Sequence, residues 1–270
     1  MKYFVTIAVM LCTLSANAQE IKRNQWTVQP HVKTNTYFVQ GAATILREVL
    51  MAGIAGTYKM STSEYTDFIT RNSWYIPEFE LGVPYYSVSS ADGAKLAKPL
   101  TWRQALWGDY SHTFDFSAGY EVAWKSLVSP FGAYISIDWE YQQLAIENSA
   151  EAGKHRTQMV VPSVGLRYRL WGGNFEKKRR PGIEIGAAYV HHFKYNNPHN
   201  YDLDAINNGI RGKIALGLEY PSIHSSIIVQ YEHDFFNTFN QDYIDDNGAK
   251  PFADFKSSFG QLIVKYSRTF

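Results

Sequence analysis

Apolar and polar residues alternate with a period of two along much of this chain. In residues 114–124 the even positions are Phe, Phe, Ala, Tyr, Val and Trp, whereas the odd positions are Asp, Ser, Gly, Glu and Ala. After the Ser129-Pro130 turn, the odd positions of residues 131–141 are apolar, and the even positions include Asp138 and Glu140. Successive side chains of a strand point to opposite faces. The pattern therefore predicts strands with one apolar face and one polar face.

This alternation predicts about ten strands, although it also allows eight or twelve. It is strong in the segments 114–124, 131–141, 160–170, 183–193, 210–220, 227–235 and 262–270. It is weaker in the N-terminal third, where the predicted strands are 26–38, 53–59 and 79–85. Residues 42–51 fit either a short helix or an extension of a strand. An even strand number follows if both ends of the chain lie on the same side of a membrane.

The connections between these strands alternate in length. Residues 125–130 and 221–224 are short turns, whereas 144–156, 195–208 and 237–257 are long loops. A soluble β-sandwich also has alternating strands, but it rarely needs strands this long. Short turns on one side and long loops on the other are typical of transmembrane barrels. We therefore predict an all-β fold, a closed antiparallel up-and-down transmembrane β-barrel formed by residues 19–270, with the basic turn 177–180 on the periplasmic side.

Composition supports this prediction. Aromatic residues make up 16% of the chain, and many fall at the ends of the predicted strands. A transmembrane barrel places aromatic side chains at both membrane interfaces. The sequence predicts one girdle at Trp124, Phe131, Tyr168, Tyr220 and Phe270, and a second at Trp139, Tyr141, Phe193 and Phe235.

Both ends of the sequence predict export to the outer membrane of a Gram-negative bacterium. Residues 1–18 combine Lys2, an apolar run and the ending Ala16-Asn17-Ala18, which is the layout of a secretory signal peptide. The apolar run is too short to span a bilayer. The last residues resemble the signal by which barrel-assembly machinery recognises outer-membrane barrels, although Arg268 departs from the pattern. The matching residues are Leu262, Val264, Tyr266 and Phe270.

The polar faces of the predicted strands carry charges of both signs. A barrel of about ten strands is narrow, so its interior should be filled by side chains. We expect these charges to pair into a plug of salt bridges; the alternative is the lining of a selective pore. The predicted lumen residues are Asp115, Glu121, Asp138, Glu140, Arg167, Arg169, Glu184, Arg211, Lys213, Glu219, Glu232, Asp234 and Lys265.

The expected partners are lipids rather than nucleic acid. The formal net charge is +1 and no basic stripe is present, which argues against a nucleic-acid surface. The sequence suggests neither a metal site nor a cofactor. His112, His191 and His233 fall on the lipid-facing register near the outer rim, where they would either contact lipopolysaccharide phosphates or serve as interface residues with a polar tip.

The order of several segments is similar to that of outer-membrane lipid A deacylases of the acyloxyacyl-hydrolase kind. The segments are "ELGVPYYSV", "KPLTWRQALWGDY", "FDFSAGYEVAW" and a strand ending in His-Phe before an Asn-rich loop, within residues 31–220. That resemblance implies a His-x-Ser-Asn motif with a serine nucleophile and a histidine base. Two positions after His191 and His192, however, stand Phe193 and Lys194, which lack the hydroxyl. If the chain were an enzyme, the candidates would be His191, His192 and Asp204.

These observations favour a barrel with a plugged or narrow lumen and a structural or binding role at the cell surface. The alternatives are an acyl-ester hydrolase acting on lipid A or phospholipid and, third, a small-solute channel. We expect no acyl-ester chemistry at His191 or His192, because the nucleophile that the resemblance requires is missing.

Overall fold

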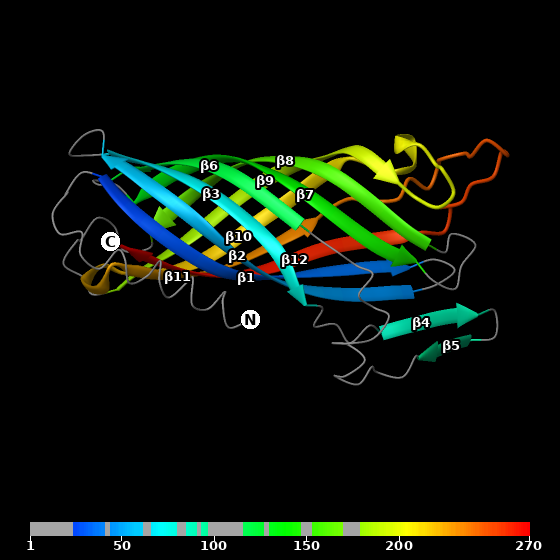
Figure 1. Ribbon diagram of the computed structural model, residues 1–270, viewed down its shortest axis with the longest axis horizontal. Coiled ribbons are helices and arrows are strands. Elements are labelled where there is room, and N and C mark those ends of the chain that lie inside the picture. The colour runs from blue at the N-terminus through cyan, green and yellow to red at the C-terminus, as the bar shows by residue number, and fades with distance from the viewer. Residues whose placement is uncertain are drawn as a thin grey trace.

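The structure is a computed structural model that describes residues 24–40, 44–61, 66–79, 85–90, 93–96, 116–126, 130–146, 153–169 and 179–270 (Figure 1). The predicted signal peptide lies outside these residues. The elements are β1 (Asn24–Gln40), β2 (Thr44–Ser61), β3 (Thr66–Phe79), β4 (Tyr85–Ser90), β5 (Gly93–Leu96), β6 (Phe116–Ser126), β7 (Phe131–Ile146), β8 (Gly153–Arg169), β9 (Arg180–Asn196), η1 (Leu203–Ala205), β10 (Gly209–Tyr220), η2 (Pro221–Ile223), β11 (Ser225–Asp234) and β12 (Lys256–Thr269).

Within the described residues, ten strands close into one antiparallel barrel. Their order is β1-β12-β11-β10-β9-β8-β7-β6-β3-β2, and β2 pairs again with β1. β1 closes the barrel by pairing on both sides; its residue Val28, for example, lies opposite Arg268 on β12 and opposite Gly56 on β2. β4 and β5 form a hairpin that pairs with the first residues of β2 and stands apart from the barrel (Figure 1). Closure leaves no unpaired barrel edge for the hydrocarbon to contact.

Burial along the barrel strands follows the predicted period of two. On β7, Ile135 and Ile137 are exposed, whereas Ser136 is buried. On β11, Tyr231 is exposed and Glu232 is buried, which confirms the predicted inside–outside register of that strand. An outer surface of exposed apolar side chains around a polar interior is the arrangement that a bilayer demands of a spanning barrel. The predicted transmembrane barrel is therefore confirmed.

The strands are longer than the alternation predicted. β7 continues to Ile146 and β8 begins at Gly153, so much of the predicted loop 144–156 is strand. Residues 44–51 extend β2 rather than forming a helix. Alternation marks only the part of a strand that has one face in lipid, and a strand that continues beyond the membrane loses the signal while keeping its ladder of hydrogen bonds.

The third N-terminal barrel strand that the structure describes, Thr66–Phe79, was not predicted by the alternation. Phe79 ends β3 and Tyr85 begins β4, and the rest of the predicted strand 79–85 lies outside the described residues. β3 pairs with β2 on one side and with β6 on the other. Pairing on both edges defines this strand, because the fit to its neighbours outweighs intrinsic strand preference.

The two ends of the barrel differ as predicted. η2 makes the short connection between β10 and β11, at the end where the backbone N–H of Phe270 donates to the carbonyl of Trp26. The connections from β9 to β10 and from β11 to β12 lie together at the opposite end (Figure 1). Among the described residues, no helix is both long and apolar enough to cross a bilayer.

Candidate functional site: the charged lumen and its loop cap

Arg211 is the centre of an ion cluster inside the barrel. It lies on the inward face of β10, and its side chain is fully buried. Its Nε donates to Asp234 Oδ1 at 2.5 Å and its Nη1 to Glu140 Oε1 at 2.9 Å, while Glu232 Oε2 lies 3.7 Å from Nη1. A buried charge is tolerated only when it is paired and hydrogen-bonded. The cluster therefore joins β10 to β11 and, across the lumen, to β7.

A second cluster surrounds Arg167 on β8. Its Nη2 donates to Glu121 Oε1 at 2.8 Å, and its Nε donates to a carboxylate oxygen of Glu184 at 2.5 Å. The guanidinium lies over the ring of Tyr134, 4.6 Å from the centroid. These side chains come from β6, β7, β8 and β9. The Arg167 cluster thus links four neighbouring strands on the wall of the lumen.

Two glycines make room for the Tyr134 ring. Tyr134 pairs with Gly165, which in turn pairs with Gly186 on the next strand. A Cβ at Gly165 would lie 2.2 Å from the ring, and one at Gly186 would lie 2.3 Å from the hydroxyl oxygen. Any side chain at these positions would collide with the tyrosine. The absence of a side chain therefore lets the ring lie flat against the wall beneath Arg167.

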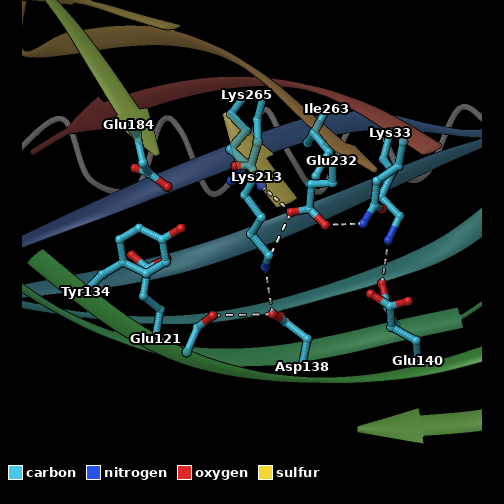
Figure 2. Close-up of a pocket in the computed structure, with 14 residues that line it drawn as sticks. Lys33, Glu121, Tyr134, Asp138, Glu140, Glu184, Lys213, Glu232, Ile263 and Lys265 are labelled. Carbon is cyan, nitrogen blue, oxygen red and sulfur yellow. Dashed lines mark hydrogen bonds and ion pairs between the residues drawn. The ribbon is translucent and has the colours of Figure 1, made fainter. Parts of the chain in front are cut away.

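A small polar chamber is lined by carboxylates of both clusters, among them Glu121 and Glu184 of the Arg167 cluster and Glu140 and Glu232 of the Arg211 cluster (Figure 2). Its cavity volume is about 30 Å³, room for about two water molecules. Lys213 Nζ reaches into it and lies 3.4 Å from Glu232 Oε1 and 3.9 Å from Asp138 Oδ2. The Tyr134 hydroxyl and Gln261 Oε1 are buried without a hydrogen-bond partner. The chamber therefore offers water a place among these polar groups.

Neutral side chains complete the network around the chamber. Glu232 accepts hydrogen bonds from the side-chain amides of Gln230 and Gln261. Lys265 Nζ donates to Gln230 Oε1 at 2.6 Å, and Lys33 Nζ donates to Ser117 Oγ at 3.2 Å. The lumen cations and carboxylates that the structure describes nearly balance. They are Lys33, Arg167, Arg211, Lys213 and Lys265, against Glu121, Asp138, Glu140, Glu184, Glu232 and Asp234.

The long loops pack into an apolar cap at one end of the lumen. His155 of β8 is buried under this cap, where its Nδ1 lies 2.5 Å from the hydroxyl of Tyr195. Arg211 lies under the ring of Phe259, 4.6 Å from the centroid. The cap therefore rests directly on the Arg211 cluster. Its buried residues are Tyr195, Ala205, Ile206, Phe239, Phe252, Phe255 and Phe259, with Tyr201 and Tyr243 packed against them.

Backbone-directed hydrogen bonds tie the two loops of the cap together. Asn237 donates to the Phe255 carbonyl at 2.8 Å and accepts from the Ser257 amide at 2.8 Å. Asn207, in the other loop, donates to the Asn237 carbonyl at 2.9 Å. A bridge between Ile206 and Phe239 joins the loops a second time. Satisfied backbone groups and a buried apolar core make the cap an ordered structure.

The structure brings most of the predicted lumen residues together, although it divides them between two centres. Glu219 is half-buried and lies opposite Arg180 in the β9–β10 register, towards the short-turn end of β10. Asp115 and the side chain of Arg169 lie outside the described residues. The neutral residues Ser117, Tyr134, Gln230 and Gln261, as well as Lys33, were not predicted. The period of two would have placed Gln230 inside, because it lies two positions before Glu232.

His191, His192 and Asp204 do not form a common site. His191 is exposed and stacks on Tyr189, whereas His192 is buried on the inner side, and its backbone N–H donates to Asn208 Oδ1. Asp204 is exposed in η1. Among the described residues, no hydrogen bond joins either imidazole to a hydroxyl or to Asp204, and no cluster of three or more His, Cys, Asp or Glu could hold a metal ion. His112 lies outside the described residues.

The predicted assembly residues lie on the outer surface of the closing strand. Leu262, Val264 and Tyr266 are exposed on β12, and Phe270 follows its last residue. Recognition of these residues by assembly machinery stays a prediction.

No protein-family model matches the chain, and no curated protein matches it. Among solved structures, the chain is similar to the outer membrane protein OprG from Pseudomonas aeruginosa, with 10% identity, a TM-score of 0.39 and coverage of 94% of this chain and 99% of that one. It is also similar to an outer membrane channel from Pseudomonas putida F1, with 8% identity, a TM-score of 0.39 and coverage of 94% of this chain and 98% of that one. A third similar structure is the translocator domain of the autotransporter NalP from Neisseria meningitidis, with 10% identity, a TM-score of 0.36 and coverage of 98% of this chain and 95% of that one. Similarity this low does not extend to function, and the identification of a barrel rests on the strand pairing described above.

Proposed function

We propose that this protein is an outer-membrane barrel with a closed lumen that holds an ordered loop cap at the cell surface, in a structural or binding role. The observation that carries this proposal is the fully buried Arg211, which draws carboxylates from both sides of the lumen into one cluster. Ion pairs that cross the lumen occupy the space that a solute would need.

The cap supports the same conclusion from a second direction. Phe259 belongs to the aromatic core of the cap and contacts Arg211. The apolar cap and the charged cluster therefore obstruct the same end of the lumen. The long loops of a transmembrane barrel face outwards and its short turns face the periplasm. The cap is therefore proposed to lie at the outer surface, where its exposed residues are available to a partner.

The two other functions have less support. A small-solute channel needs a continuous open lumen, whereas the chamber holds only about two water molecules. An acyl-ester hydrolase needs a nucleophile beside its base. The described residues place no hydroxyl within hydrogen-bond distance of His191 or His192.

Conductance across planar lipid bilayers tests the closed lumen. The refolded wild type should insert without producing steady current steps. Phe252→Ala, which loosens the cap alone, should also remain closed because the clusters still block the lumen. The combination of Phe252→Ala with Glu140→Ala, Arg211→Ala and Asp234→Ala should conduct, which shows that insertion and detection work. A steady open state in the wild type would overturn the proposal in favour of a channel.

A further inference from the structure

Three cations lie on the lipid-facing side of the barrel, at the ends of β8 and β9 that adjoin the cap. Lys154, Arg156 and Lys194 are all exposed. Lys154 and Arg156 share the outward face of β8 with Val164 and Leu166 of the apolar belt. In the β8–β9 register, Lys194 pairs with Gln158, two residues from Arg156. The three side chains therefore belong to one face of two adjacent strands.

A β-bulge turns Lys194 to this face. Gln158 pairs with Lys194 and Met159 with His192, so Phe193 is left without a partner. Ala188, Val190 and His192, the last even-numbered residues before the bulge, are buried towards the lumen, and without the bulge Lys194 would follow them. Instead, Phe193 and Lys194 are both exposed, and Tyr195 turns inward to the cap. Bulges at barrel rims commonly re-aim side chains in this way.

Within the part of the chain that the structure describes, these cations differ from those of the lumen in lacking carboxylate partners. Arg211, Arg167 and Lys213 each lie within ion-pair distance of at least two carboxylates. Among the described residues, no ion pair involves Lys154, Arg156 or Lys194. Arg156 Nε donates to Gln143 Oε1 at 2.9 Å, which fixes the guanidinium and leaves its other donors available.

Their height matches the headgroup region of a bilayer. Phe193 is exposed beside the stacked pair Tyr189 and His191, as expected for a girdle at the membrane interface. At a rise of about 3.3 Å per residue, Arg156 lies about 7 Å, and Lys154 about 13 Å, beyond the level of Lys194 along the strand. Lysine and arginine at such a rim extend their charged ends towards the headgroups.

We propose that Arg156 and Lys194, with Lys154 above them, bind the phosphate groups of an anionic lipid of the outer leaflet, of the lipid A type. Arginine can grip a phosphate with two parallel hydrogen bonds, and lysine adds a point charge. The acyl chains of the same molecule would lie on the apolar belt below. This inference rests on the outer-membrane placement proposed above, but not on closure of the lumen.

The test compares two double variants that each lose one arginine and one lysine. Arg156→Gln/Lys194→Gln removes cations of the site, whereas the control Arg179→Gln/Lys250→Gln removes exposed cations from other places. Each protein is placed in phosphatidylcholine nanodiscs, and binding of fluorescent lipid A is titrated at low salt. At ~1 kcal/mol for each cation, the site variant should bind about thirty-fold more weakly, whereas the control should bind as the wild type does. The charge-preserving Arg156→Lys/Lys194→Arg should retain binding.

Two further arms identify the source of the phosphate. Lipid A stripped of its phosphates should bind the wild type as weakly as intact lipid A binds the site variant, and millimolar inorganic phosphate should not compete. Equal affinity of the site variant and the control would overturn the proposal, as would effective competition by inorganic phosphate. Unfolding of all variants is measured in parallel to verify folding. Conductance of the same proteins reports separately on the closed lumen, so failure of one proposal is distinguishable from failure of the other.

Discussion

Replacement of Arg211 by methionine should destabilise the barrel strongly. The guanidinium is fully buried and lies within 3.7 Å of three carboxylates, those of Glu140, Glu232 and Asp234. Methionine fills a similar volume but leaves these carboxylates close together, with Lys213 as the nearby cation on Glu232. Removal of one partner from a buried ion pair costs about 3–5 kcal/mol. We expect Arg211→Met to lower the free energy of unfolding by an amount in that range.

A second substitution makes this prediction sharper. Glu140→Gln alone should destabilise, because it removes the negative charge that pairs with Arg211 Nη1 at 2.9 Å. In the Arg211→Met background, the same substitution should stabilise, because it then removes one of the crowded negative charges. The sign of the Glu140→Gln effect should therefore reverse. Such a reversal is a direct measure of coupling between two side chains in contact.

Equilibrium unfolding in urea from lipid vesicles measures these free energies. Tryptophan fluorescence provides the signal, since the chain has seven tryptophans, and linear extrapolation gives the free energy of unfolding in water. The exposed pair Lys250–Asp242, whose charged atoms lie 3.3 Å apart, serves as the control. Lys250→Met should change stability by less than ~1 kcal/mol, as for most exposed ion pairs. An Arg211→Met loss no larger than that of the control, or a Glu140→Gln effect of the same sign in both backgrounds, would refute the reasoning.

Three other predictions concern the wall, the cap and the topology. Gly165→Ala should lower the free energy of unfolding by about 1–3 kcal/mol, because the new methyl group forces the Tyr134 ring from its place. In a Tyr134→Ala background the same substitution should cost much less. Thermal unfolding in detergent measures both effects, and an equal cost of Gly165→Ala in the two backgrounds would contradict the contact. Tyr195→Phe removes the cap hydrogen bond to His155, so proteolysis of the long loops should accelerate while urea unfolding changes by only about 1 kcal/mol; unchanged proteolysis would show that this bond does not hold the cap. On intact cells, a protease that cuts before aspartate should cleave within residues 237–257, whereas trypsin should spare the basic residues 177–180; cleavage at 177–180 in sealed cells would invert the topology.

The sequence by itself determined which residues face lipid and which face the lumen. Ile135 and Ile137 outside, and Glu140 and Glu232 inside, follow from the period of two, because a strand offers only two faces and a bilayer accepts only apolar side chains on one of them. It also indicated that the interior would be filled with charges of both signs. That information is local, and each strand carries it independently.

Only the tertiary structure decided which of those charges meet. Glu140 and Arg211 are 71 residues apart, and their contact depends on how the strands are staggered around the closed barrel, which alternation within one strand does not encode. The same holds for β3, which is defined by its neighbours, and for the cap, where aromatic side chains from β9, two loops and β12 form one core. The bulge beside Phe193 sets the outward face of Lys194. The contact of Glu140 with Arg211, the position of β3, the cap and the bulge have one physical reason in common. Each depends on the register between strands, which is settled when the barrel closes.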